Sequence, residues 1–242
     1  MRVVTWNLDG LDPRHLDVRT EAAIAALLVE PPDVILLQEV TRRTWHAHLR
    51  PHLSHAGYAA AIVPPDDDEG YVEAVLSRLP LTGAERHPLV ESGQSRHLML
   101  VEAVWQGEPT RLASAHLESG AAAAEVRQAQ ASQVAELLLG GPPAVFGGDT
   151  NLRKAEAAAV PALGELVDAF EAAGRPSSAR FTWDTRRCPN VPGRGPRARF
   201  DRLWLAGSWA VDGLGMIGQT VVPGTGLWPS DHAGLWAQIR RV

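Results

Sequence analysis

The chain has 242 residues, 45% of them hydrophobic, and a formal net charge of −5. It can bury a large core and nothing in it forces a division, so we expect a single domain spanning residues 1–242. The negative charge argues against an overall basic nucleic-acid-binding surface, and no apolar run approaches the roughly 18 residues that span a bilayer.

Strand and helix patterns alternate at the start of the chain. Apolar runs predict strands at residues 2–7 and 33–38, with an amphipathic helix at 14–29 between them. Further strands are expected at 58–63, 72–77, 97–105, 110–116, 143–146, 200–205, 210–217 and 234–239, and further helices at 121–139 and 162–173. Parallel crossovers mixed with hairpins predict an α/β fold, in which two sheets pack face to face with helices outside.

The number of cysteines and the N-terminal residues indicate the cellular compartment. Cys188 is the only cysteine, so no internal disulfide can form. Met1 leads directly into a strand-like run, without the apolar segment of a secretion signal. We therefore expect a cytoplasmic protein with no membrane partner.

Two charged segments interrupt this pattern. Eight arginines and two acids between Arg175 and Arg202 give a local charge of +6, which is typical of an anion-binding surface but also of a solvated loop. Four acids at residues 66–69, between two prolines and Gly70, are expected to form a solvated hairpin turn.

A carboxylate and an amide follow the predicted strand at residues 143–146. Gly147 and Gly148 predict a sharp turn, after which Asp149 and Asn151 project from the end of the strand. Ligands usually bind at the carboxyl ends of strands in open sheets. This segment is therefore the first candidate for a functional site.

Similar polar residues occur at the ends of other predicted strands. They are Asn7, Asp9, Glu39, His116, Asp231 and His232. Mg²⁺ needs only one or two protein carboxylates, and Glu39 suits that role, with Asp9 and Asp231 near it. The sequence has no CxxC pair and no HExxH helix, which argues against a thiolate or zincin-type zinc site.

Each of these residues taken alone has another interpretation. Asn7 can cap a turn, Glu39 can be a helix-capping acid, and His116 can be a half-buried imidazole bonded to the backbone. Together and in this order, the motifs TWN, LQE, GDTN and SDH resemble the exonuclease–endonuclease–phosphatase superfamily.

The segments TWNLDGLD, HLES, TWDT and RFDR resemble the 5′-tyrosyl-DNA phosphodiesterase (type 2) branch of that superfamily. The resemblance covers nearly the whole chain and departs chiefly at residues 66–69 and around Arg194. It implies a DNase I-like, four-layered α/β sandwich with two mixed, mainly antiparallel sheets. The implied activity is metal-dependent hydrolysis of a phosphodiester at a DNA end.

The resemblance also implies roles for the catalytic and metal-binding residues. Glu39 would hold Mg²⁺, or Mn²⁺ as the alternative, with support from Asp9 and Asp231. Asp149 would orient or deprotonate the attacking water, with Asn7 and Asn151 positioning water and phosphate. His232, oriented by Asp201, would donate to the phosphate, and His116 would be a second donor.

The substrate-binding residues implied by the resemblance are Arg153, Trp183, Ser119 and Phe200. Trp183 would stack on the nucleotide and Arg153 would contact it through charge, while Ser119 would bind a phosphate and Phe200 would form an apolar wall. Trp183 can instead be a core aromatic residue. We expect a monomer whose partner is single-stranded or end-frayed DNA with a 5′ adduct.

Other functions remain open within the same chemistry. They are an apurinic endonuclease, a 3′ exonuclease, a 2′,5′-specific ribonuclease, and a phosphatase acting on inositol or sphingolipid substrates. From another class, an inactive nucleic-acid-binding module of the same fold is the alternative, and the intact polar set argues against it.

Overall fold

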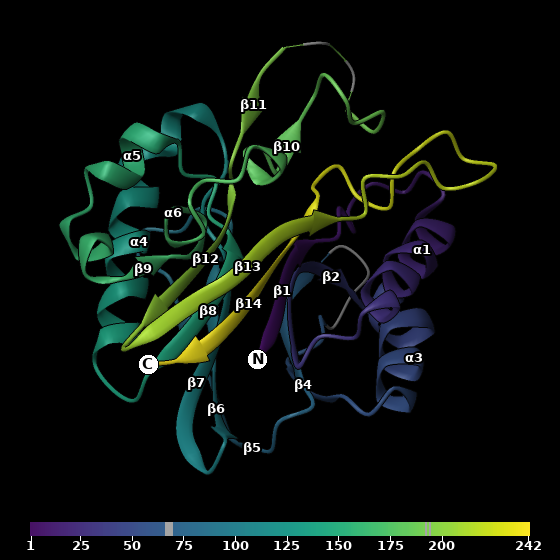
Figure 1. Ribbon diagram of the computed structural model, residues 1–242. Helices are drawn as coiled ribbons and strands as arrows, with labels where there is room; N and C mark the ends of the chain where they lie inside the picture. The colour runs from purple at the N-terminus through teal and green to yellow at the C-terminus, as the bar shows by residue number, and fades with distance from the viewer. Residues whose placement is uncertain (66–69, 192, 194) are drawn as a thin grey trace.

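Two six-stranded β-sheets form the centre of the computed structural model, which describes residues 1–65, 70–191, 193 and 195–242 (Figure 1). In spatial order, the first sheet contains β13 (Trp209–Ile217), β14 (Gly234–Arg241), β1 (Arg2–Asn7), β2 (Val34–Thr41), β4 (Tyr71–Ser77) and β3 (Ala59–Ile62). The second contains β5 (Leu81–Pro88), β6 (His97–Trp105), β7 (Glu108–His116), β8 (Ala144–Asp149), β12 (Asp201–Ala206) and β9 (Val167–Asp168). A separate two-stranded ribbon pairs β10 (Trp183–Asp184) with β11 (Arg197–Ala198).

Helices cover the outer face of each sheet. In Figure 1, α1 (Leu16–Val29) and α3 (Arg50–His55) lie on one side of the sheets and α4 (Ala124–Leu139) on the other. The shorter helical elements are α2 (Arg42–Thr44), the π-helix η1 (Trp45–Leu49), η2 (Ala121–Ala123), α5 (Lys154–Ala158), η3 (Pro161–Glu165), α6 (Ala169–Ala172) and η4 (Ser177–Ala179).

Three hydrophobic cores hold the resulting four layers together. The central core joins the sheets, with Leu36 of β2 and Val145 of β8 both fully buried. One outer core packs Val134 of α4 on the second sheet, and the other packs Leu27 of α1 on the first. Because both faces of β2 and β8 are covered, residues 34–37 and 144–146 are uninterrupted apolar runs. The four-layered α/β sandwich with two mixed, mainly antiparallel sheets predicted from the sequence is confirmed.

Strand direction places several strand ends at one edge of the sandwich. Each sheet is antiparallel except for one pair, β1 with β2 in the first and β7 with β8 in the second. Asn7 at the end of β1 pairs with Gln38 within β2, and His116 and Asp149 are partners at the ends of β7 and β8. Asp201, the first residue of β12, pairs with Asp149.

The prediction of a sharp turn at Gly147 and Gly148 is wrong. β8 continues through both glycines to Asp149, and neither has a positive φ angle. A Cβ atom on Gly147 would lie 2.7 Å from side-chain atoms of Thr5 and Leu36, and one on Gly148 would lie 2.2 Å from the Ala115 carbonyl oxygen. The glycines are therefore required for close packing between strands and between sheets.

Other boundaries also differ from the predictions. The single helix expected at 162–173 is divided into η3, β9 and α6, where the Asp168 side chain accepts a 2.9 Å hydrogen bond from the Phe170 amide and caps α6. The strand β5 was not predicted, because it is largely exposed and lacks a regular apolar alternation. The acidic run at 66–69 and Arg194 lie outside the described residues. None of the described helices is long and apolar enough to cross a membrane.

Candidate active site

Polar side chains from both sheets meet at the edge where the strands end. Asn7 links them, because its Nδ2 donates to Glu39 Oε1 at 3.2 Å and to Asp149 Oδ2 at 3.0 Å. Its Oδ1 accepts from the Asp9 amide at 2.9 Å, and its backbone carbonyl accepts from the Ser230 hydroxyl at 2.6 Å. One amide thus sets the separation of two carboxylates that belong to different sheets.

Glu39 projects into the site from an irregularity in β2. The pairing of β2 with β4 shifts register between Leu37 and Val40, and Glu39 has a φ angle of 54° in the left-handed region. A bulge redirects a side chain that regular pleating would point elsewhere. The Glu39 carbonyl lies against Gly10, where a Cβ atom would approach it to 2.1 Å. Asp9 and Asn151 also have φ angles of 50°, so three residues of the site have left-handed backbone.

Asp149 lies at the centre of the group and is buried. Its Oδ1 accepts from the Asn151 amide at 3.0 Å, and its Oδ2 lies 3.3 Å from His116 Nε2. Asn151 Nδ2 lies 3.1 Å from the same His116 nitrogen and also donates to the Leu117 carbonyl at 3.3 Å. His116 Nε2 thus faces both an amide and a carboxylate, and its Nδ1 is buried with no hydrogen-bond partner in the described chain.

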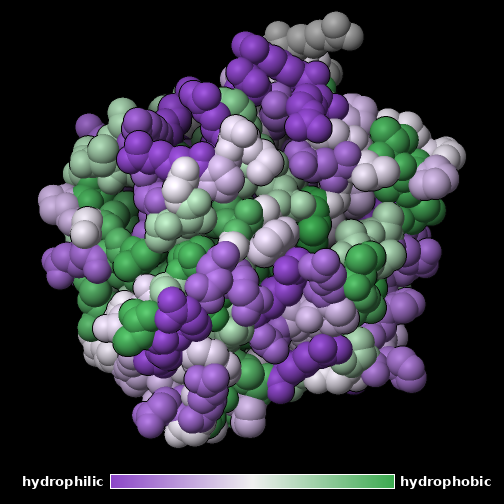
Figure 2. Space-filling model, in the orientation of Figure 1, coloured by the Kyte–Doolittle hydropathy of each residue, from purple (hydrophilic) through white to green (hydrophobic). Residues whose placement is uncertain are grey.

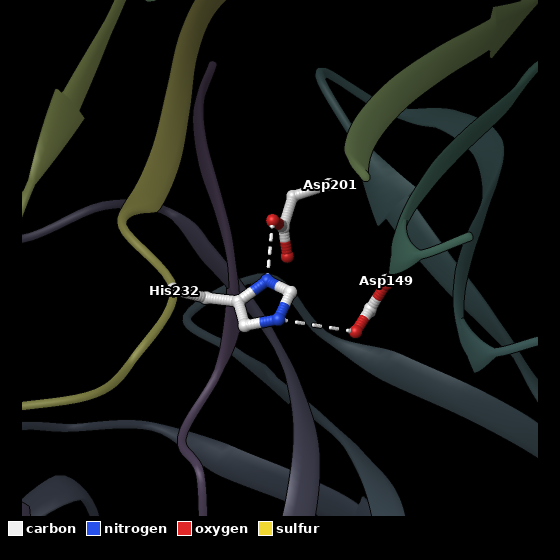
Figure 3. A group of neighbouring side chains, drawn as sticks. All are labelled: Asp149, Asp201 and His232. Carbon is white, nitrogen blue, oxygen red and sulfur yellow. Dashed lines mark hydrogen bonds and ion pairs between the residues drawn. The ribbon is translucent and has the colours of Figure 1, made fainter. Parts of the chain in front are cut away.

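His232 lies between two aspartates, as Figure 3 shows. Its Nδ1 is 2.7 Å from Asp201 Oδ2, and its Nε2 is 3.5 Å from Asp149 Oδ2. The Asp201 amide donates to the Thr182 hydroxyl at 3.1 Å, which fixes the start of β12. Asp201 therefore holds one imidazole nitrogen, and the other faces the centre of the site.

The two histidines differ in charge, because their pKa values are shifted in opposite directions. Burial by itself lowers the pKa of His232, but Asp201, Asp149 and Asp231 outweigh it and raise that pKa well above its ordinary value. At His116 burial dominates and lowers the pKa to about 3, although Asp149 opposes the shift. At neutral pH, His232 is a charged donor and His116 is a neutral imidazole.

The carboxylates of Asp9, Glu39 and Asp231 lie close enough together to raise one another's energy when ionised. Burial, and then the charge of Asp231, raise the pKa of Asp9 to about 7, even though Asp9 Oδ2 lies 3.2 Å from Nη1 of the buried Arg19. Burial also raises the pKa of Glu39, with Asp231 and Asp149 adding to the effect. Carboxylates that repel one another in this way favour a cation between them.

The substrate residues predicted from the sequence divide into two sets. Trp183 and Phe200 lie beside His232: the ring centroids of Trp183 and Phe200 are 5.7 Å apart, and those of Phe200 and His232 are 6.5 Å apart. Trp183 Nε1 also donates to Asp231 Oδ2 at 3.1 Å. Ser119 instead bonds to Gln94, and Arg153 lines a neighbouring cavity. The structure thus brings together the catalytic and metal candidates with Trp183 and Phe200, and places Ser119 and Arg153 outside this group of contacts.

Several supporting residues were missed at the sequence level. Gln38 Nε2 donates to Ser114 Oγ at 3.0 Å and to Thr5 Oγ1 at 3.2 Å, which joins the two sheets directly beneath the site. Arg19 is fully buried and donates to the backbone carbonyls of Asp12 and Pro229 as well as to Asp9. Gln38 lies within the LQE motif, whereas Arg19 resembles any charged helix residue and gave no signal.

Asp149, Asp201 and His232 offer ligand atoms that all lie within 4.8 Å of one another, a spacing that a metal ion can span. An imidazole binds a metal through a deprotonated nitrogen. Both nitrogens of His232 face carboxylates and its pKa is raised, so the ring lacks a free lone pair at neutral pH. The carboxylates around Glu39 suit a hard divalent cation better than this group does.

Comparison with known proteins agrees with this geometry. Residues 4–232 match the endonuclease/exonuclease/phosphatase family. The chain belongs to this family. The resemblance inferred from the TWN, LQE, GDTN and SDH motifs is thereby confirmed.

Within the family, the chain is similar to tyrosyl-DNA phosphodiesterase 2 of Xenopus tropicalis, with 32% identity over 96% of the chain. The chain spans 64% of the length of that relative. The crystal structure of truncated Caenorhabditis elegans TDP2 is 30% identical and has a TM-score of 0.87, covering 100% of this chain and 97% of the other. The structure of D. rerio TDP2 complexed with single-strand DNA product is 28% identical with a TM-score of 0.87, covering 99% and 98%.

Proposed function

We propose that this chain is a divalent-metal-dependent phosphodiesterase that hydrolyses a 5′-tyrosyl–DNA linkage or a closely related ester at a DNA end. One observation carries the proposal. Asn7 separates a crowded carboxylate group at Glu39 from a charged imidazole, His232, that faces the buried acid Asp149. Residues 1–242 act in this proposal as a single catalytic domain, since the three cores are continuous with the strands that carry the site.

The donor set near Glu39 fits Mg²⁺, and Mn²⁺ is the alternative with the same ligand preference. The fit rests on the chemistry of the donors, because Glu39, Asp9 and Asp231 offer carboxylate oxygens whose negative charges oppose one another, and a bound cation would reverse the raised pKa values of Glu39 and Asp9. Glu39 would hold the ion, and Asp9 and Asp231 would support it directly or through water. When bound, the ion supplies Lewis-acid stabilisation of charge on the phosphoryl and leaving oxygens.

The remaining residues supply the water and the donors. Asp149 accepts the proton of the attacking water, whose oxygen forms the new bond to phosphorus as the bond to the tyrosine oxygen breaks. Asn7 and Asn151 keep Asp149 in place through the hydrogen bonds described above. His232 donates from Nε2 to the phosphoryl oxygen, and neutral His116 is the second donor to the phosphate.

The leaving group and the neighbouring rings favour a tyrosyl ester of DNA. A departing phenol has a pKa of about 10, so its oxygen leaves as an anion without a strong general acid. Trp183 and Phe200 form a half-buried aromatic surface beside His232, which suits stacking with the first base. The relatives named tyrosyl-DNA phosphodiesterase 2, and the D. rerio TDP2 structure with single-strand DNA product, support the same substrate class. Arg153 and Ser119 would contact the strand beyond this nucleotide.

The test uses a 5′-phosphotyrosyl oligonucleotide with and without Mg²⁺. Asp149→Asn and His232→Ala are each expected to lower kcat by about 10²- to 10⁴-fold while leaving the thermal unfolding transition in place. Full activity in either folded variant, or in the presence of EDTA, would refute the mechanism. Apurinic-site DNA, a 3′-ended duplex, 2′,5′-linked RNA and an inositol phosphate serve as parallel substrates, and faster turnover of one of them would redirect the assignment.

A further inference from the structure

Arg19 is the only charged residue among the largest fully buried side chains of the described chain. It lies near the start of α1, and its side chain is 0% exposed. Figure 2 shows hydrophilic side chains along the upper edge of the molecule, and Arg19 is not one of them, because none of its side chain reaches the surface. Burying a guanidinium is costly unless it is paired and hydrogen-bonded. This arginine has no role in the chemistry proposed above, so its burial requires an explanation.

Each N–H group of this guanidinium has an acceptor. Nε donates to the Arg14 carbonyl at 2.9 Å. Nη1 donates to the Pro229 carbonyl at 3.0 Å and to Asp9 Oδ2 at 3.2 Å. Nη2 donates to the carbonyls of Asp12 at 2.7 Å and Asp9 at 3.2 Å. The donors of the planar fork are thus fully used, and most of them hold backbone rather than side chains.

These hydrogen bonds fix the turn that carries Asp9. Asp9 has a φ angle of 50°, a left-handed conformation that is unfavourable for a residue with a side chain. Its amide donates to Asn7 Oδ1 at 2.9 Å, and its carbonyl accepts from Arg19 Nη2. Gly10 then lies against the Glu39 carbonyl, where a Cβ atom would approach to 2.1 Å. Arg19 therefore stabilises the backbone that places Asp9 beside Glu39.

The same guanidinium contacts the segment that carries Asp231. Pro229, which accepts from Nη1, is 210 residues from Arg19 in the chain. Ser230 follows it and donates to the Asn7 carbonyl at 2.6 Å, and Asp231 comes next. In Figure 1 this yellow segment, which precedes β14, passes the upper end of α1. One side chain thus connects the two loops that supply carboxylates to the site.

We propose that Arg19 is a positioning residue for the divalent cation, which holds the carboxylates of Asp9 and Asp231 around Glu39 without touching the cation or the substrate. This role rests on the proposed function, which takes the cation to bind at Glu39. Residues that orient metal ligands in this way commonly set the affinity of a site. A nearby positive charge opposes cation binding, but Asp9 Oδ2 pairs with Arg19 at 3.2 Å and backbone carbonyls accept its other protons. We expect the positioning to outweigh the repulsion.

Arg19→Lys separates these two contributions. It keeps the positive charge but has fewer donors and no planar fork. The matched control is Arg111→Lys, because Arg111 is also buried and donates to the carbonyls of Leu138 at 2.6 Å and Pro142 at 3.3 Å. Arg111 lies near the start of β7, whereas the site lies at the end of that strand. A second variant, Arg19→Gln, keeps an amide donor and removes the charge.

The main measurement is Mn²⁺ binding to the protein without substrate, followed by the electron paramagnetic resonance signal of free Mn²⁺, with thermal unfolding recorded for every variant. We expect the Kd for Mn²⁺ to rise about tenfold in Arg19→Lys, to rise in Arg19→Gln, and to stay unchanged in Arg111→Lys. In hydrolysis of the 5′-phosphotyrosyl oligonucleotide, Arg19→Lys should need more Mg²⁺ for half-maximal activity. Its kcat should return to the wild-type value at saturating Mg²⁺, since Arg19 donates to neither Asp149 nor His232.

A wild-type Kd for Mn²⁺ in folded Arg19→Lys would overturn the proposal, and so would tighter Mn²⁺ binding by Arg19→Gln, which would make Arg19 a repelling charge. Loss of cooperative unfolding in both Arg19 variants, with Arg111→Lys intact, would also overturn it and assign Arg19 to folding alone. In each of these cases, Mg²⁺-dependent turnover by the wild type leaves the proposed function standing. A wild type that neither binds Mn²⁺ nor hydrolyses the oligonucleotide would instead defeat the proposed function.

Discussion

The hydrogen bond between Asp201 and His232 gives the sharpest test of the charge state on which the chemistry depends. Asp201 is fully buried and its Oδ2 lies 2.7 Å from His232 Nδ1. Asp201→Asn keeps the shape of the side chain and removes its charge. Breaking a buried ion pair from one side costs about 3–5 kcal/mol if the partner stays charged, so His232 is expected to lose its proton at neutral pH instead.

The consequence for catalysis follows from the loss of that proton. A positioned proton donor contributes about 10²- to 10⁴-fold to the rate, which corresponds to about 3–5 kcal/mol of the barrier. We expect kcat of Asp201→Asn to fall by this factor at neutral pH. In the wild type the raised pKa of His232 keeps activity constant past neutrality, whereas in the variant the residual activity should fall as pH rises through a lower value.

The assay is steady-state hydrolysis of a p-nitrophenyl ester of a 5′-mononucleotide between about pH 5 and pH 9, with thermal unfolding recorded for each protein. Asp212→Asn is the matched control, because Asp212 pairs with Arg240 at 3.1 Å on the exposed surface of β13. It should change stability by less than about 0.5 kcal/mol and leave the pH profile unchanged. A pH profile of Asp201→Asn that coincides with the wild type would refute the reasoning, whatever the size of the kcat change.

Two further predictions concern stability. Gly10→Ala places a Cβ atom 2.1 Å from the Glu39 carbonyl oxygen, so it should lower the free energy of unfolding by about 1–3 kcal/mol and raise the Mg²⁺ concentration needed for half-maximal activity. Gly164→Ala has open space around the new Cβ atom and should change neither quantity. Equal melting temperatures for the two variants would contradict this prediction. Burial raises the pKa of Glu73 from 4.5 to about 7, so stability should fall by on the order of 3 kcal/mol as pH rises between these values. Urea unfolding of Glu73→Gln should lack this fall, and parallel pH curves for variant and wild type would exclude it.

Local patterns were sufficient for several buried strands and for the long helix α4. Residues 34–37 of β2 and 144–146 of β8 are continuous apolar runs, and the alanine-rich segment at residues 121–139, followed by glycines, identified α4. The edge strand β5 and the segment at residues 162–173 were missed or misassigned, because tertiary contacts and a single aspartate cap define them. The two glycines of β8 illustrate the same limit, since their role depends on a strand of the other sheet.

The sequence by itself determined which residue types end the central strands, and hence the family and the candidates Asn7, Glu39, Asp149 and His232. Only the tertiary structure decided how they are used. The pKa values of His116 and His232 move in opposite directions although the residue type is the same, because burial dominates at one and three carboxylates dominate at the other. Charge state depends on distances between residues far apart in the chain, and these distances exist only once the two sheets have packed.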